Sequence, residues 1–251
     1  MLGIPKRIFY AERRGGAMAN PEASEVGTGL SEQVAEALRE RIISGRLPGG
    51  SKLNERELSA ELQVSRIPLR EALPLLEAEG FIHSEARRGS FVHTFTLRDA
   101  VEVFDLRLRL EPFAAQCAAL RVAGGASPED LLASLEYART GIPGEQASGR
   151  NSDLHEDIVR LADHDLLRRL SSLLNGRVRW LFRLTPERDT PGMWEEHAEL
   201  VHAIAEGRPA LAEALASAHV ERGRHASLPH LSERLPSEPV PRRGRKTRSP
   251  A

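Results

Sequence analysis

Residues 54–80 read NERELSAELQVSRIPLREALPLLEAEG and predict two helices separated by a tight break. Asn54 is a good N-cap for the first helix. Ser65 caps the second helix, which runs to about Glu79, and Gly80 follows it as a helix-ending residue. Two short helices joined in this way are typical of a helix-turn-helix.

The residues on either side of this stretch complete a larger unit. Upstream, apolar residues recur at helical spacing after the N-cap candidate Ser31, namely Val34, Leu38 and Ile42. Downstream, residues 81–83 and 90–92 alternate like strands around a turn at residues 87–89. Helix, helix, turn, helix and hairpin together predict a winged helix-turn-helix over residues 30–95.

The next section, residues 96–231, has helical periodicity and no strand signal. The first predicted helix covers about 96–122, and a second starts at residues 127–130. Further helices are predicted at about 151–162, 164–184, 192–206 and 209–226. The predicted fold class is therefore mainly α: an N-terminal winged helix-turn-helix, with three helices plus a β-hairpin wing, and a C-terminal antiparallel all-α helical bundle.

Both ends of the chain are poor in core-forming residues. Residues 1–29 show no periodicity and are expected to form a disordered N-terminal segment, so Met18 is an alternative start to Met1. Residues 232–251 are rich in Pro, Ser and Arg and are expected to form a disordered basic tail. A solubilising role for this tail is favoured over nonspecific attraction to DNA.

Bulk composition excludes several protein classes. The net charge is −1, so any case for nucleic-acid binding must be local. The single cysteine, Cys117, permits no intrachain disulfide, which fits the reducing cytoplasm. No apolar run approaches the roughly 20 residues of a membrane span, so no membrane partner is expected.

Arginines at the start of the third helix suggest a surface that reads DNA. Arg66 and Arg70 are four residues apart and project from one helix face, where guanidinium groups match guanine in the major groove. Arg56 can reach the DNA backbone, and Arg88 and Gly89 form a wing tip. The alternative is an ordinary solvated face, because residues 30–93 hold nine basic and ten acidic side chains. The order of the elements favours DNA.

Pro74 lies inside the third helix and removes the amide that would bond the Arg70 carbonyl. We therefore expect this helix to be bent at the proline.

Three helices of the bundle each direct a histidine inward. Asn151 and His155 share a helix face, and His197 and His219 lie on the apolar faces of two later helices. Converging neutral imidazoles can bind a divalent metal, with zinc favoured and nickel or manganese as alternatives. The alternative for each histidine alone is a hydrogen-bonded core residue.

The stretch ISGRLPGGSKLNERELSAELQVSRIPLREALPLLEAEGFI, with RRGSFV after it, resembles the DNA-binding domain of the GntR family of bacterial regulators. The resemblance implies that six residues contact double-stranded DNA, including Ser65 in addition to those named above: Arg56, Ser65, Arg66, Arg70, Arg88 and Gly89.

The bundle resembles the FCD-type effector domain of the FadR-like branch, which implies an effector-binding and dimerisation domain at residues 96–231. The family pattern matches a metal site made by Asn151, His155, His197 and His219. It also matches Arg107 to an arginine near the ligand, although an intrahelical pair with Glu111 is equally expected. An open metal position would suit a small organic acid as effector.

The predicted function is a homodimeric transcription regulator, by default a repressor, on a palindromic operator. Two alternatives stay open. One is a metal-dependent enzyme that uses the three histidines, although no general base or nucleophile is convincingly placed with them. The other is a DNA-binding dimer whose histidines are only structural.

Overall fold

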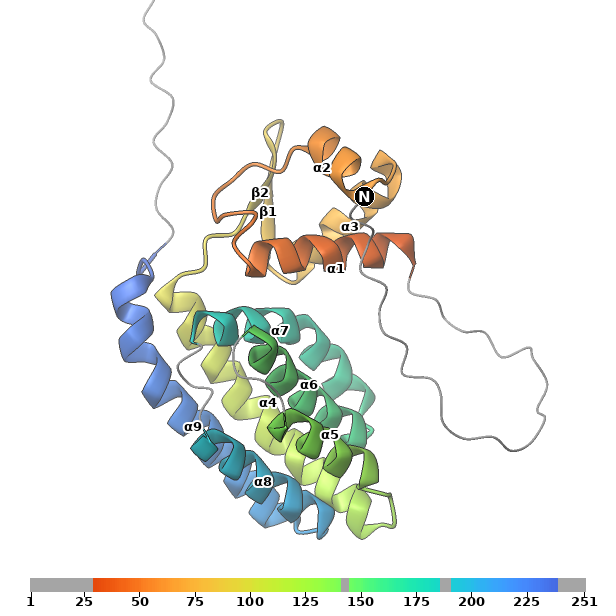
Figure 1. Ribbon diagram of the computed structural model, residues 1–251, viewed down its shortest axis with the longest axis vertical. Coiled ribbons are helices and arrows are strands. Elements are labelled where there is room, and N and C mark those ends of the chain that lie inside the picture. Colours follow the sequence, from red (N-terminus) through yellow and green to blue (C-terminus); the bar gives the residue numbers. More distant parts are fainter. Residues whose placement is uncertain (1–28, 141–144, 186–190, 239–251) are drawn as a thin grey trace, which may run out of the picture.

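The computed structural model describes residues 29–140, 145–185 and 191–238. The N-terminal elements are α1 (Leu30–Ile43), α2 (Glu55–Leu62), α3 (Arg66–Ala78), β1 (Ile82–Glu85) and β2 (Gly89–Val92). The bundle consists of α4 (Leu97–Ala123), α5 (Glu129–Arg139), α6 (Glu145–Ala162), α7 (Asp165–Leu184), α8 (Pro191–Ala205) and α9 (Pro209–Arg234). Figure 1 shows the first group at one end, above the bundle.

The winged helix-turn-helix and the helical bundle are both confirmed as the fold class. Strands β1 and β2 form an antiparallel pair in which Ile82 faces Val92 and Glu85 faces Gly89. Residues 51–53 flank the same hairpin, since the Leu53 amide donates to the Ser90 carbonyl at 2.9 Å. The strands of the wing therefore pair with each other and also with the loop between α1 and α2.

Helix caps explain where the first elements begin, with one correction. Helix α1 begins after Gly29, so Ser31 lies inside the helix and its prediction as the N-cap was wrong. Asn54 caps α2 as predicted, because its side chain accepts from the amides of Arg56 and Glu57. Ser65 is the N-cap residue of α3, but its side chain makes no capping hydrogen bond. The hydroxyl of Ser65 is exposed and can make other contacts.

Helix α3 continues through Pro74 for four more residues. Leu69, Ala72 and Leu76 are fully buried on one side of it, while Pro74 is exposed on the other. The apolar burial on both sides of the proline offsets the lost amide hydrogen bond. The bend at Pro74 stays a prediction.

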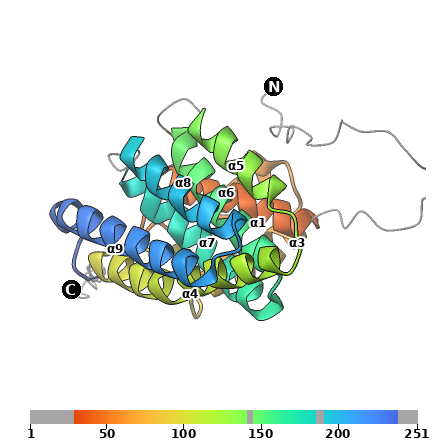
Figure 2. The ribbon, with the colours of Figure 1, turned by 90° about the horizontal axis from the view of Figure 1, so that it is seen from below.

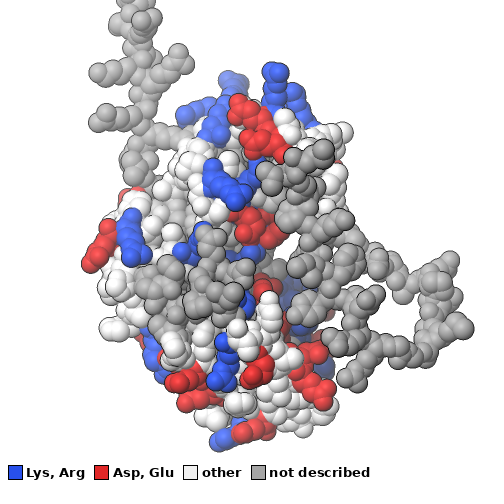
Figure 3. Space-filling view, in the orientation of Figure 1, with Lys and Arg blue, Asp and Glu red and all other residues white. Residues whose placement is uncertain are grey.

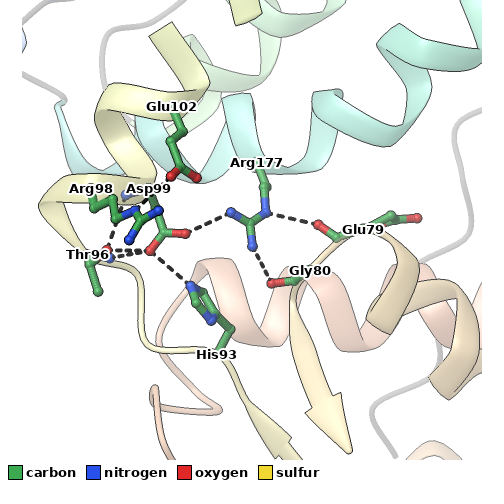
Figure 4. Close-up of polar contacts among 8 residues, drawn as sticks. All are labelled: Glu79, Gly80, His93, Thr96, Arg98, Asp99, Glu102 and Arg177. Atoms are coloured by element: carbon green, nitrogen blue, oxygen red, sulfur yellow. Dashed lines mark hydrogen bonds and ion pairs between the residues drawn. The ribbon is translucent and has the colours of Figure 1, made fainter. Parts of the chain in front are cut away.

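A capping box begins the bundle. The Thr96 hydroxyl accepts from the Asp99 amide, and the Asp99 carboxylate accepts from the Thr96 amide at 2.9 Å. His93, in the segment between hairpin and bundle, lies 2.9 Å from the same carboxylate (Figure 4). Burial alone would raise the pKa of Asp99, but the hydrogen bonds from His93 and Thr96 outweigh it and hold this pKa well below its ordinary value.

Helices α4 and α9 run side by side along the length of the bundle (Figure 2). Helix α9 ends at Arg234, not near residue 226 as predicted, and it contains Pro229. The reason is packing, since Leu231 is fully buried beyond that proline. Helix α6 likewise begins at Glu145, six residues before the predicted start.

The two halves of the molecule share a core. Phe81, which follows α3, stacks on Trp180 of α7 with ring centroids 5.3 Å apart. Phe95 packs against the same indole at 4.9 Å. One apolar cluster therefore includes residues of the winged unit together with α7 and the end of α9. This shared core makes the position of the winged unit depend on α7.

None of the helices in the described ranges is both long enough and apolar enough to cross a membrane. The predicted N-terminal segment with its alternative start at Met18 lies outside the described residues, as does the basic run at residues 242–248.

Candidate functional site

The exposed start of α3 carries the residues predicted to read DNA. Ser65, Arg66 and Arg70 are all exposed, whereas Pro68 and Leu69, which lie between the two arginines, are buried. The helix is therefore anchored by one face and presents its arginines on the other. This is the geometry that a recognition helix needs.

Helix α2 supplies two neighbours of this face. Arg70 Nε lies 2.7 Å from Glu55 Oε2, in an ion pair that is largely exposed. Arg56, the next residue of α2, is exposed as well. An exposed ion pair contributes little stability, so Arg70 can exchange Glu55 for a DNA base at small cost.

The wing presents a second group of basic residues. Arg88 pairs with Glu85 across the turn, and its guanidinium lies 5.5 Å from the Phe91 ring. Gly89 has a φ of 95°, and a Cβ there would lie 3.3 Å from Lys52 Cε. Lys52 is thus a basic residue at the wing that the sequence reading missed. Its pairing with β2 depends on a bridge to Phe91 that local patterns do not reveal.

On the face of the winged unit that Figure 3 shows, basic and acidic side chains are mixed. Figure 3 shows Lys and Arg side chains projecting from the end of the molecule that holds the winged unit, with acidic side chains between them. Charge alone therefore gives weak attraction to DNA, and recognition depends on where individual arginines stand.

The structure brings together the three histidines that the sequence singled out. His155 on α6, His197 on α8 and His219 on α9 each offer one ring nitrogen, and these atoms lie within 4.8 Å of one another. The Nε2 atoms of His155 and His197 are 3.3 Å apart. His197 and His219 are almost completely buried.

A separate oxygen atom lies against the other ring nitrogen of each histidine. Nδ1 of His155 lies 3.2 Å from Glu111 Oε2. Nδ1 of His197 lies 2.8 Å from the Met193 carbonyl oxygen, and Nδ1 of His219 lies 2.9 Å from Glu196 Oε2. An acceptor on Nδ1 keeps the proton there and leaves Nε2 as a lone-pair donor, as in most protein metal sites.

Asn151 lies one helical turn before His155 and is buried. Its amide nitrogen donates to the Met193 sulfur at 3.6 Å. Its Oδ1 has no hydrogen-bond partner among the described residues. A buried carbonyl oxygen without a partner is costly, and a cation would satisfy it.

Arg107 is buried next to the histidines. Its Nε donates to Glu111 Oε1 at 2.5 Å, and its guanidinium lies 4.8 Å from the Phe182 ring. The intrahelical pair with Glu111 is therefore present. Arg107 Nη1 has no hydrogen-bond partner among the described residues. The Glu111 carboxylate contacts both Arg107 and His155 and therefore links the arginine to the histidine site.

The sequence reading missed several residues of this site. It treated Glu111 only as a partner of Arg107 and did not identify Glu196, Met193 or Phe182. Glu196 directly precedes His197, yet its carboxylate serves His219 on another helix. Only the packing of α8 against α9 could reveal that contact.

Comparison with known families supports both halves. Residues 30–92 match the model of bacterial regulatory proteins of the gntR family, and residues 102–222 match the FCD domain. The chain is 30% identical over 198 residues to a probable D-xylose utilization operon transcriptional repressor of Paenarthrobacter nicotinovorans, covering 77% of this chain and 86% of that protein.

It is also 36% identical over 147 residues to the gluconate operon transcriptional repressor of Bacillus subtilis. That match covers 57% of this chain and spans only 59% of the relative's length.

Solved structures share the fold. A putative transcriptional regulator from Rhodococcus superposes with a TM-score of 0.63 at 23% identity, over 79% of this chain and 97% of that one. E. coli McbR/YncC gives a TM-score of 0.65 at 20% identity, over 80% of this chain and 98% of that one. Identities this low establish the shared architecture alone.

Proposed function

Because the chain belongs to the GntR family of bacterial regulatory proteins and carries an FCD domain, we propose that it is a transcriptional repressor controlled by a small effector. Members of this family regulate transcription and are not enzymes, so the metal-dependent enzyme is set aside. The observation that carries the proposal is the pairing of an exposed arginine face on α3 with a buried histidine site in the same chain.

In this proposal the DNA contacts come from two places on the winged unit. Arg66 and Arg70 enter the major groove, while Ser65 and Arg56 contact the phosphates. The wing adds Arg88, and Gly89 allows the backbone to approach the duplex closely.

A divalent metal fits the histidine site. His155, His197 and His219 would hold it through Nε2, and the buried Oδ1 of Asn151 gains the partner that it lacks. Three imidazoles and an amide oxygen suit zinc, with nickel or manganese as alternatives. When bound, the metal would supply a positive charge that attracts a carboxylate.

The effector in this proposal is a small organic acid. Arg107 is 1% exposed and its Nη1 is without a hydrogen-bond partner among the described residues. A carboxylate beside the histidines would provide an acceptor for that donor. The acid is therefore recognised by Arg107 as well as by the metal.

A homodimer is supported by an unusual set of exposed apolar side chains. Leu106, Phe113 and Leu120 recur every seven residues along α4, and each is at least 41% exposed. Leu166, Leu170 and Leu173 are also exposed, and their spacing of four and three residues puts them on one face of α7. Phe113 packs against His164 at the start of α7, so the two stripes adjoin.

We name these six residues the α4–α7 stripe. If a second copy of the chain covered this stripe, the two copies would form a two-fold symmetric dimer, which suits a palindromic operator. The cytoplasm is the proposed location of the protein.

The proposal is tested with the metal-loaded protein. An operator duplex is selected from a random-sequence library, and small carboxylates are screened for a rise in melting temperature. We expect at least one acid to raise the melting temperature and to weaken operator binding. A protein that selects no duplex would refute the regulator, and unaltered melting with every acid would refute the carboxylate effector.

A further inference from the structure

One guanidinium of the bundle closes the end of the recognition helix. Arg177 of α7 donates from Nε to the Glu79 carbonyl at 3.0 Å and from Nη2 to the Gly80 carbonyl at 2.8 Å. Its Nη1 lies 2.9 Å from Asp99 Oδ1 at the start of α4 (Figure 4). A single side chain therefore joins α3, α4 and α7.

The chemistry of this contact is specific to arginine. The last carbonyls of a helix have no intrahelical partner and carry partial negative charge, which a cation satisfies. The planar fork of arginine reaches two carbonyls and a carboxylate at once, which an ammonium cannot do in the same geometry. Gly80 has a φ of 74°, and a Cβ there would lie 2.2 Å from Arg177 Nη2. The backbone and the arginine are thus fitted to each other.

The same helix touches the histidine site farther along. Phe182 lies against the Arg107 guanidinium and has its ring centroid 6.3 Å from that of His155. Between Arg177 and Phe182 on α7, Trp180 stacks on Phe81 with an interplanar angle of 8°. Helix α7 therefore contacts the proposed effector site and the end of α3 within a short segment.

A second arginine of α7 attaches a different helix. Arg179 Nη1 lies 3.1 Å from Glu36 Oε1, and Nη2 pairs with Glu40, both on α1. These pairs are partly exposed and reach α3 only indirectly, because Glu36 also pairs with Arg39 of α1, which bonds the Glu79 carboxylate. Arg177 is thus the residue of α7 that bonds the end of the recognition helix directly, through its backbone carbonyls.

We propose that Arg177 is a positioning residue for operator recognition, holding α3 where α7 sets it and passing the state of the histidine site to α3. The second half of this statement rests on the proposed function of that site. A shift of α7 caused by occupancy near Phe182 would move the cap on the α3 carbonyls. The angle at which Arg66 and Arg70 meet DNA would then change.

The test compares three variants of the full chain: R177Q, R177K and the control R168A. Arg168 lies on the same helix, and its one ion pair within the described part of the chain is with Asp165 of α7. Each is assayed on the selected operator duplex, without metal and with zinc as the probe. Hydrogen exchange is followed over residues 76–82 and over α1. Zinc affinity is measured separately by competition with a chromophoric chelator.

We expect R177Q and R177K to bind the operator at least tenfold more weakly than the unaltered protein without metal. Exchange over residues 76–82 should be faster in both, while α1 stays protected and R168A behaves like the parent. Zinc affinity should stay within twofold of the parent. Any zinc-induced change in operator affinity should fall to less than a third in the Arg177 variants.

Operator affinity and exchange that stay unchanged in R177Q would overturn the positioning role. A full zinc response in R177Q, or zinc binding that alters neither exchange nor operator affinity in the parent, would overturn the transmission to α3. Absence of zinc binding in the parent would refute the metal site, and with it the transmission that rests on it. The positioning role is still decided by the metal-free measurements.

Discussion

The carboxylate of Glu196 lies 2.9 Å from Nδ1 of His219, one of the three histidines of the cluster. The same carboxylate pairs with Arg222 at 2.7 Å and is held in place by it. Oriented acceptors of this kind raise the basicity of a ligating imidazole.

We therefore predict that E196Q lowers zinc affinity by about 10- to 100-fold. The measurement is chelator competition at fixed pH. The neighbouring variant E195Q is the control, since Glu195 is exposed. Equal zinc affinity in both variants would show that Glu196 has no part in the site.

Asn151 gives a prediction of the opposite sign. Because Oδ1 lies one helical turn before His155, is buried and has no hydrogen-bond partner among the described residues, N151D would add a charged oxygen ligand. We expect zinc affinity to rise by about tenfold, since affinity increases with ligand charge. N54D makes the same change at the α2 N-cap, where Asp caps as well as Asn, and should leave zinc affinity unaltered. A weaker N151D site would mean that residue 151 is not a ligand.

The double variant R66A/R70A should lose operator binding. Each bidentate contact to a base contributes about 1–3 kcal/mol, so losing both contacts should weaken operator affinity by about 30-fold or more. The control R98A removes another exposed arginine, which pairs with Glu102 on α4. Gel shifts on the selected duplex compare the two variants, with circular dichroism to verify folding. Retention of operator affinity by the folded double variant would remove the DNA-reading role of α3.

A charge placed in the α4–α7 stripe should separate the dimer. We predict that F113E is a monomer by analytical ultracentrifugation at concentrations where the parent is a dimer, because the carboxylate would be buried without a partner. Tyr137 on α5 is 60% exposed and lies outside the stripe, so Y137E is the control. A parent that sediments as a monomer would exclude the homodimer.

The pH dependence of the unfolding free energy should reveal how much the ionised Asp99 carboxylate stabilises the fold. Its pKa is lowered in the folded state, so the stability that it contributes is complete above the unfolded pKa of about 4 and is lost as the pH falls through the folded value. D99N should therefore cost about 3 kcal/mol of unfolding free energy at pH 7. That difference should shrink below pH 4. Urea unfolding across this range checks it, with H93Q as the companion variant, since His93 faces the same carboxylate. A difference independent of pH would exclude the charge as its cause.

Local rules predicted much of this molecule and failed where contacts are long-range. Helical spacing identified the arginine face of α3 and predicted that the three histidines point inward. Each of these predictions depends only on the positions of residues within a single helix. The end of α9 was misjudged because Leu231 is buried against elements far away in sequence, and that burial outweighs Pro229. Glu196 was missed for the same reason. Arg177, one arginine among many on α7, has no local signal at all.

The spacing of five positions from Arg177 to Phe182 constrains how this helix can vary. Each residue of an α-helix turns the chain by about 100° and advances it by about 1.5 Å. Inserting or deleting one residue between them would swing the guanidinium away from the α3 carbonyls while the phenyl ring stayed in place. Related chains should therefore tolerate length changes in the loops that flank α7 but keep its internal register constant.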